Sequence, residues 1–174
     1  MVNYIDAASG PQQPRATMKP TPPDWPRIST AVFYADPRRA IDFLCRAFGF
    51  SVRLCVEGEG GRIEHSELEY GEGLVMVAGA GPEYQREGQP WRQGYRSPAQ
   101  LQGQSTQSLC VHVDDADAHC ATARAAGARI VSEPKTTDYG ADYWSDRGYA
   151  ALDIDGHVWW FMQRVTTRGV PHAG

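Results

Sequence analysis

Residues 30–49 read TAVFYADPRRAIDFLCRAFG, and residues 108–127 read SLCVHVDDADAHCATARAAG. In each stretch a β-rich run leads to an aspartate, Asp36 or Asp114, and a glycine follows thirteen positions later, Gly49 or Gly127. The apolar residues between aspartate and glycine recur with helical spacing. The two stretches therefore indicate one strand-and-helix unit written twice. A repeated unit usually cannot bury its apolar face alone, so we expect the two copies to pack together, with function lying between them.

The sequence beyond each copy extends it to the order βαβββ. Three more strands are predicted in the first copy, at 51–57, 62–70 and 73–78, with glycine-rich turns between them. Three more are predicted in the second copy, at 128–133, 148–153 and 157–164. The stretch 135–148 is predicted to be an irregular loop that borders a binding site. The expected fold class is α+β, with two tandem βαβββ modules.

The expected organisation follows from composition along the chain. Six prolines and few large apolar residues predict that residues 1–26 form a flexible leader. We expect the remaining chain to divide into the first module at 27–80, a linker at 81–104, the second module at 105–165 and a tail at 166–174.

Charge and hydropathy exclude two classes of partner. The net charge is −4 and no long basic run is present, so we expect no nucleic acid partner. The longest apolar runs, 74–78 and 158–162, are too short to cross a bilayer, and no signal segment opens the chain. The four cysteines form no C-x-x-C pair, and we expect them to be free thiols. These features favour a cytoplasmic protein with no membrane partner.

The segments DRGY at 146–149 and DIDGHVWWF at 153–161, within duplicated βαβββ modules, resemble the vicinal oxygen chelate superfamily. This superfamily includes glyoxalase I, bleomycin resistance proteins and extradiol dioxygenases. The segments AIDF at 40–43, HSEL at 65–68 and AAGA at 125–128 resemble its PhnB-like branch. The resemblance implies that each sheet is a curved half-cup with the helix on its convex side and the ligand on its concave side. It also implies a homodimer, since cups of this superfamily are often completed across a two-fold interface.

Catalytic members of the superfamily hold a divalent metal through His, Gln or Glu on the first and last strands of each module. The resemblance places these positions at Ser29, Met76 or Val77, Ser108 (Gln107 under a one-residue shift) and Trp160. A serine hydroxyl is a poor ligand for such metals, and an indole has no lone pair to give. We therefore expect no metal and no cofactor, and we expect the usual glyoxalase and dioxygenase chemistry to be absent.

Strand alternation predicts which side chains face the cup. Trp159 and Phe161 should pack under a helix, while Trp160 should point inward, where an indole favours flat aromatic or cationic ligands. Arg147 either clamps an acidic group of the ligand or holds the long loop in place. The candidate ligand contacts are Phe33, His65, Glu67, Met76, Ser108, Cys110, His112, Arg147, Tyr149 and Trp160.

These features predict a metal-independent protein that binds a small organic molecule, aromatic or antibiotic-like, in the manner of bleomycin resistance proteins. An alternative is a metal-dependent lyase, isomerase or dioxygenase that uses displaced ligands, namely His65, Glu67 and His112. A third interpretation is a metal-free enzyme with His112 as its base. The sequence leaves open whether the chain is an enzyme.

Overall fold

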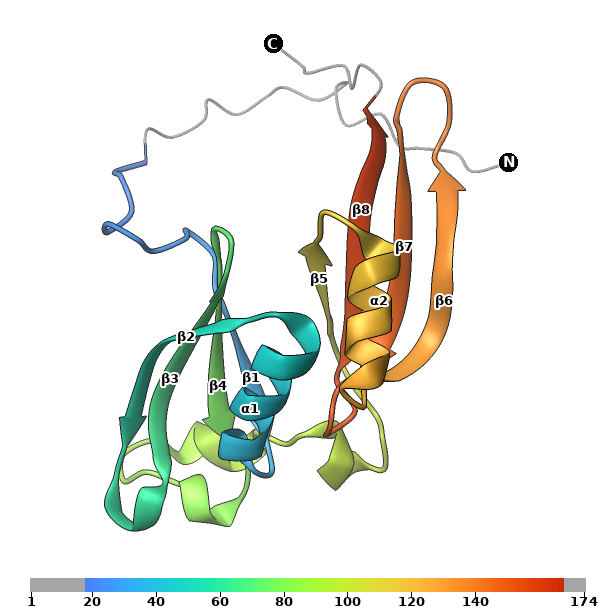
Figure 1. The fold of residues 1–174 in the computed structure, drawn as a ribbon. Coiled ribbons are helices and arrows are strands. Elements are labelled where there is room, and N and C mark those ends of the chain that lie inside the picture. The colour runs from blue at the N-terminus through green and yellow to red at the C-terminus, as the bar shows by residue number, and fades with distance from the viewer. Residues whose placement is uncertain (1–17, 168–174) are drawn as a thin grey trace.

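The computed structural model describes residues 18–167, which form two βαβββ modules (Figure 1). The first module contains β1 (Thr30–Tyr34), α1 (Pro37–Phe48), β2 (Ser51–Glu57), β3 (Ile63–Tyr70) and β4 (Gly73–Gly79). The second contains β5 (Ser108–His112), α2 (Ala116–Ala125), β6 (Arg129–Asp138), β7 (Trp144–Leu152) and β8 (Val158–Thr167). The sheets have the equivalent orders β1-β4-β3-β2 and β5-β8-β7-β6, so the predicted α+β fold is confirmed. Most of the expected leader and tail, residues 1–17 and 168–174, lies outside the described residues.

The helix ends follow local sequence. Asp36 caps α1 by accepting the backbone N–H of Arg39 at 3.1 Å, and Gly49 ends the helix in the left-handed region at φ 75°. In the second module the capping residue is Asp115 and not Asp114, because the Asp115 carboxylate accepts two backbone N–H groups at 3.0 Å each. Neither helix is long and apolar enough to cross a membrane, and no other described segment is such a helix.

The stretch 135–148 is largely regular, which corrects the expectation of an irregular loop. β6 continues to Asp138, and β7 already begins at Trp144, so the two strands form a long hairpin. Its turn is closed by a bond from the Gly140 N–H to the Asp138 carboxylate at 2.9 Å. Pro134 is tolerated within β6 because this strand lies at the edge of its sheet.

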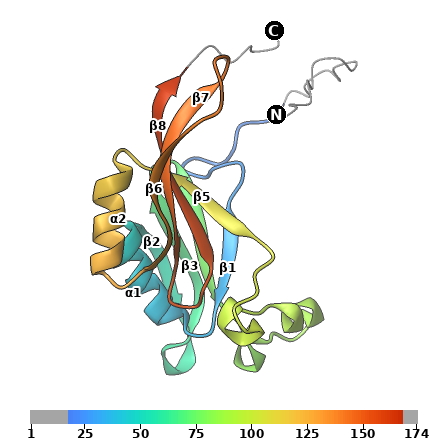
Figure 2. The same ribbon diagram turned by 90° about the vertical axis from the view of Figure 1, so that its right-hand side faces the viewer.

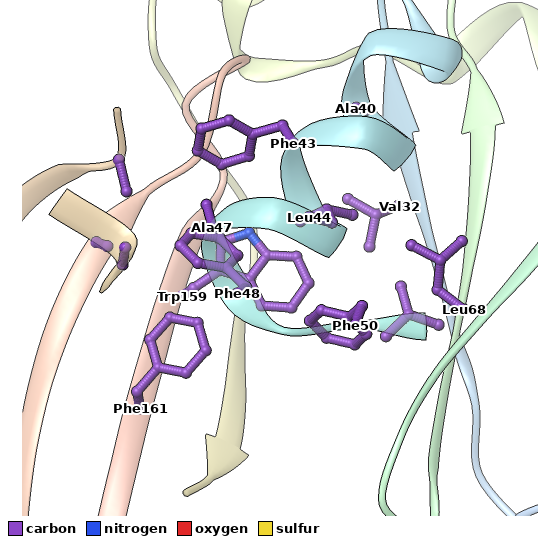
Figure 3. Packing of buried hydrophobic residues seen from close by; sticks show 14 of the residues in the cluster. Val32, Ala40, Phe43, Leu44, Ala47, Phe48, Phe50, Leu68, Trp159 and Phe161 are labelled. Carbon is purple, nitrogen blue, oxygen red and sulfur yellow. The ribbon is translucent and has the colours of Figure 1, made fainter. Parts of the chain in front are cut away.

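Both helices lie on the same side of the two sheets (Figure 2). The side chains beneath them form one shared core, in which Phe48 at the end of α1 contacts Trp159 and Phe161 of β8 (Figure 3). The ring centroid of Phe48 lies 5.4 Å from that of Trp159 and 4.8 Å from that of Phe161. Because the core crosses the boundary between the modules, neither module buries its apolar face alone.

A buried carboxylate also joins the modules. Asp153, which follows β7, accepts the Tyr34 hydroxyl of β1 at 2.6 Å and the Trp159 indole N–H at 2.9 Å through Oδ2. Its Oδ1 accepts three backbone N–H groups at 3.0 Å each, those of Asp155, Gly156 and His157. Burial, followed by the charge of Asp153, raises the pKa of Tyr34 well above its usual value. Tyr34 therefore stays protonated and donates to the carboxylate.

A histidine makes the second link. The Nε2 atom of His119 lies 3.2 Å from the carbonyl oxygen of Phe48, and Nδ1 lies 2.6 Å from the Tyr149 hydroxyl. Since a carbonyl can only accept, the proton is assigned to Nε2, and Nδ1 accepts from Tyr149. Burial lowers the pKa of His119, which favours this neutral form. These two contacts join α2, which carries His119, to the end of α1 and to β7.

Candidate ligand-binding site

The second sheet has one face free of helices, which we call its open face. Cys110 and His112 of β5 pair with Trp160 and Met162 of β8, so these four side chains point to the same side. Trp159 and Phe161 alternate with them and are fully buried beneath the helices, whereas Trp160 is 39% exposed. The open face therefore presents an indole and a thioether beside a thiol and an imidazole.

The neighbouring strand leaves room for these large side chains. Trp160 pairs with Ala150 and Met162 pairs with Gly148 of β7. A Cβ atom added to Gly148 would lie 2.4 Å from the sulfur of Met162, so the methionine occupies the space that a side chain would need. Small residues on β7 thus let the side chains of Trp160 and Met162 spread across the open face.

The first sheet carries the other predicted contacts, and its corresponding face is partly covered by its own chain. The ring of Tyr95, from the segment between β4 and β5, stacks on Phe33 at a centroid distance of 3.9 Å. Met76, which pairs with Ala31 on the same sheet, is half-buried. Phe33 thus already contacts an aromatic ring of its own chain.

His65 and Glu67 lie together on β3. Their side chains are 2.8 Å apart, and the Glu67 carboxylate also lies 3.6 Å from the guanidinium of Arg53. Glu67 is only 6% exposed. Arg53 in turn lies over the ring of Trp25, 5.6 Å from its centroid. This cluster is held by contacts within the first module and the segment preceding it.

A hollow with a volume of about 1030 Å³ lies between the modules. It is lined by all of β5, by the start of β1 and by the turn between β3 and β4. Ser108, Cys110 and His112 line this hollow, whereas Phe33, Met76, His65, Glu67 and Trp160 do not. The hollow borders the open face along β5 and is large enough for an organic ligand of drug size.

Two predicted contacts lie on the opposite side of the second sheet. Arg147 pairs with Asp117 of α2, with its Nη2 atom 2.6 Å from the Asp117 carboxylate. Tyr149 is fully buried under α2 and bonded to His119. Alternation along β7 puts both residues on the helix side, because Gly148 and Ala150 occupy the open face. This corrects the expectation that Arg147 and Tyr149 reach a ligand in the cup.

The positions where metal-binding relatives carry ligands do not fit a divalent metal here. They present a hydroxyl group at Ser29, the thioether of Met76 or the alkyl group of Val77, and the indole of Trp160. The remaining position presents the hydroxyl group of Ser108 or, under a one-residue shift, the amide of Gln107 as the single ordinary ligand. Within residues 18–167, no group of three or more His, Cys, Asp or Glu side chains is placed to hold a metal ion. His65, Glu67 and His112 thus do not form such a group in the chain.

A cluster at the outer end of the open face was not predicted from the sequence. The carboxylate of Asp146 binds both the Trp144 indole N–H and the Arg164 guanidinium. The sequence signal was present, since Arg164 lies four residues after Trp160 and an even spacing keeps both on one face of a strand. The DRGY segment at 146–149 predicted Arg147 as the ligand contact instead.

The model of the Glyoxalase/Bleomycin resistance protein/Dioxygenase superfamily matches residues 28–161. The chain belongs to this superfamily. A similar solved structure is TioX from Micromonospora sp. ML1, with 31% sequence identity, a TM-score of 0.58, and coverage of 79% of this chain and 98% of TioX. No curated protein matches the chain.

Another similar solved structure is TnmS3, described as an antibiotic binding protein from Streptomyces sp. CB03234. It has 21% identity and a TM-score of 0.54, and the alignment covers 80% of this chain and 96% of TnmS3. UcmS2 has 20% identity and a TM-score of 0.58, with 81% of this chain and 98% of UcmS2 covered. At these identities the likeness shows the fold.

Proposed function

We propose that this superfamily member binds a small, flat aromatic molecule on the open face of its second sheet, without a metal ion. The observation that carries the proposal is the exposure of Trp160 beside Met162, while its neighbours Trp159 and Phe161 are buried. A ring stacked on an indole gains about 0.5–1.5 kcal/mol beyond the burial of its area. The Met162 sulfur adds a favourable contact to an aromatic edge. His112 and Cys110 supply polar groups that orient the ligand.

The comparisons suggest which ligands to screen first. Antibiotic binding by TnmS3 makes aromatic natural products of the antibiotic type the first class. We also propose that the chain belongs to the PhnB-like branch, because of its AIDF, HSEL and AAGA segments. A cytoplasmic location is proposed because the four cysteines are free. The proposal also keeps the module limits at 27–80 and 105–165, with a linker at 81–104.

We further propose that the protein is a homodimer. The superfamily resemblance supports this proposal, since it implies a cup that a second copy completes across a two-fold interface. The edge strand β2 also exposes three apolar side chains, those of Val52, Leu54 and Val56, which is a feature of association surfaces. Sedimentation velocity over a range of concentrations tests this state directly, and a monomer at all concentrations would contradict it.

The ligand proposal is tested by a thermal-shift screen of aromatic natural products, followed by calorimetric titration of the hits. Trp160→Leu should weaken binding of a hit by about twofold to tenfold, since it removes the stacking surface. Trp91→Leu is the matched control, because Trp91 is 61% exposed but lies in the linker. Equal affinity of the Trp160→Leu variant and the wild type would contradict the proposal.

The metal-dependent alternative is tested by elemental analysis of protein purified without added metal. A stoichiometric transition metal that is lost in His112→Ala would favour the enzyme. Protein without a stoichiometric transition metal would support the metal-independent binding function.

A further inference from the structure

The outer end of the open face carries a fixed guanidinium. Asp146 is 5% exposed, and its Oδ1 accepts the Nε–H of Arg164 at 2.5 Å. Its Oδ2 accepts the indole N–H of Trp144 at 2.9 Å. The same indole lies against the guanidinium, with Cζ of Arg164 4.8 Å from the ring centroid. One buried carboxylate thus orients both the ring and the cation, so Arg164 loses little further freedom when it binds a ligand.

The bonding pattern leaves the outer edge of Arg164 available. The carboxylate is bound through Nε, and no residue in the range 18–167 accepts a hydrogen bond from the two terminal nitrogens. The Arg164 side chain is 37% exposed and lines the hollow between the modules. Both oxygens of Asp146 are already bound, so the carboxylate has little left to offer a cationic ligand. The cluster therefore presents donors and not acceptors to the hollow.

Arg164 shares its face with the proposed stacking surface. Asp146 pairs with Arg164 as Gly148 pairs with Met162, so residues 160, 162 and 164 of β8 point to the same side. At about 3.3 Å per residue, the Cα atoms of Trp160 and Arg164 lie about 13 Å apart, with Met162 midway. A ligand of two or more rings, or one ring system with a short arm, can reach from the indole to the guanidinium.

We propose that the open face selects aromatic ligands that carry an acidic oxygen group, a carboxylate or a phenolate, and that Arg164 binds this group. The inference rests on the proposed function, since it adds a polar anchor to the aromatic site at Trp160. A guanidinium matches such groups because its parallel N–H bonds fit two acceptor lone pairs. Asp146 and Trp144 act as positioning residues that hold Arg164 for this contact.

The test uses two probes that differ only in charge, pyrene-1-butyrate and pyrene-1-butyramide. Their affinities for the full-length protein are measured by calorimetry or by pyrene fluorescence. The wild type should bind the carboxylate roughly tenfold more tightly than the amide. This is the low end for a charge-assisted hydrogen bond, because Arg164 is partly exposed and already paired with Asp146. Arg164→Gln should remove this preference and leave the affinity for the amide unchanged.

Arg147→Gln is the matched control, because it removes an equal charge from the helix side of the same sheet. It should keep the preference for the carboxylate, whereas a loss of preference in this variant would point to net charge alone. Equal binding of the two probes by the wild type would overturn the role of Arg164 and leave the aromatic site standing. Failure of both probes to bind would overturn the aromatic site and the arginine contact together. The wild-type comparison stands even if Arg164→Gln proves unstable.

Discussion

Replacing Asp153 with asparagine should destabilise the whole chain, because this carboxylate joins the two modules. Asp153 is 7% exposed and accepts five hydrogen bonds, three from the turn that follows β7 and two from Tyr34 and Trp159. The asparagine amide keeps the shape of the side chain but has only one oxygen. The three backbone N–H groups can only donate, so the single amide oxygen should face them. The NH₂ group must then face Tyr34 and Trp159.

The expected cost follows from the bonds that are lost. The indole N–H of Trp159 cannot accept a bond from the new NH₂ group, and Trp159 is fully buried, so this donor is left without a partner. An unpaired buried donor costs about 1–3 kcal/mol, and the Tyr34 bond loses its charged acceptor at a further cost of about 1 kcal/mol. The free energy of unfolding of Asp153→Asn should therefore fall by about 2–4 kcal/mol. For a chain of this size that is a drop in Tm of about 5–15 °C.

Urea unfolding at pH 7, followed by circular dichroism, measures this change through the midpoint and the slope. Asp142→Asn is the control, since Asp142 is exposed in the hairpin turn and its replacement should change stability by less than about 0.5 kcal/mol. A double-mutant cycle with Tyr34→Phe adds a sharper criterion, because residues that share a bond should show coupled losses. A loss below about 1 kcal/mol, or additive losses in the cycle, would refute the role assigned to Asp153.

Two further predictions concern the shared core. Burial lowers the pKa of His119 in the folded chain, so the unfolded chain binds more protons. The free energy of unfolding should therefore fall as the pH drops through about 6.5, the pKa of an unperturbed histidine. Urea midpoints of the wild type and His119→Gln from pH 8 to 5 measure this, and a constant difference between the two proteins would contradict it. Phe161→Ala should lower the free energy of unfolding by about 3–5 kcal/mol, since Phe161 is fully buried. Val165→Ala, on the exposed end of the same strand, should lower it by less than about 1 kcal/mol. Similar urea midpoints for the two variants would show that the core is not centred where the structure places it.

The sequence predicted the elements that depend on local signals. The capping aspartate and the left-handed glycine at the two ends of α1 lie within fourteen residues of each other, and their preferences do not depend on the rest of the fold. Strand alternation correctly predicted that Trp159 and Phe161 lie under the helices. Three consecutive aromatic residues, 159–161, must place the first and third on one face of the strand and the second on the other. Local chemistry and strand period were therefore sufficient for the architecture.

The sequence failed where a side chain depends on a distant partner. Arg147 could not be oriented without knowing that β7 begins at Trp144, since that start and the pairing with β8 decide which residues face the helices. The role of His119 could not be found from the sequence, because its acceptor, the carbonyl of Phe48, lies 71 positions away. A usable signal did exist on the open face, where the small residues Gly148 and Ala150 lie opposite large ones.

The two modules share a fold but differ in how their helix-free faces are used, and this difference favours the second sheet as the ligand site. On the first sheet, the ring of Tyr95, from the segment between β4 and β5, stacks on Phe33. Trp25 lies against Arg53, which also contacts Glu67. A ligand would have to displace these intramolecular contacts before it could reach the first sheet. On the second sheet Trp160 remains 39% exposed, so stacking there requires no such displacement. Duplication supplied two equivalent surfaces, and the segments that cover the first one leave the second available for binding.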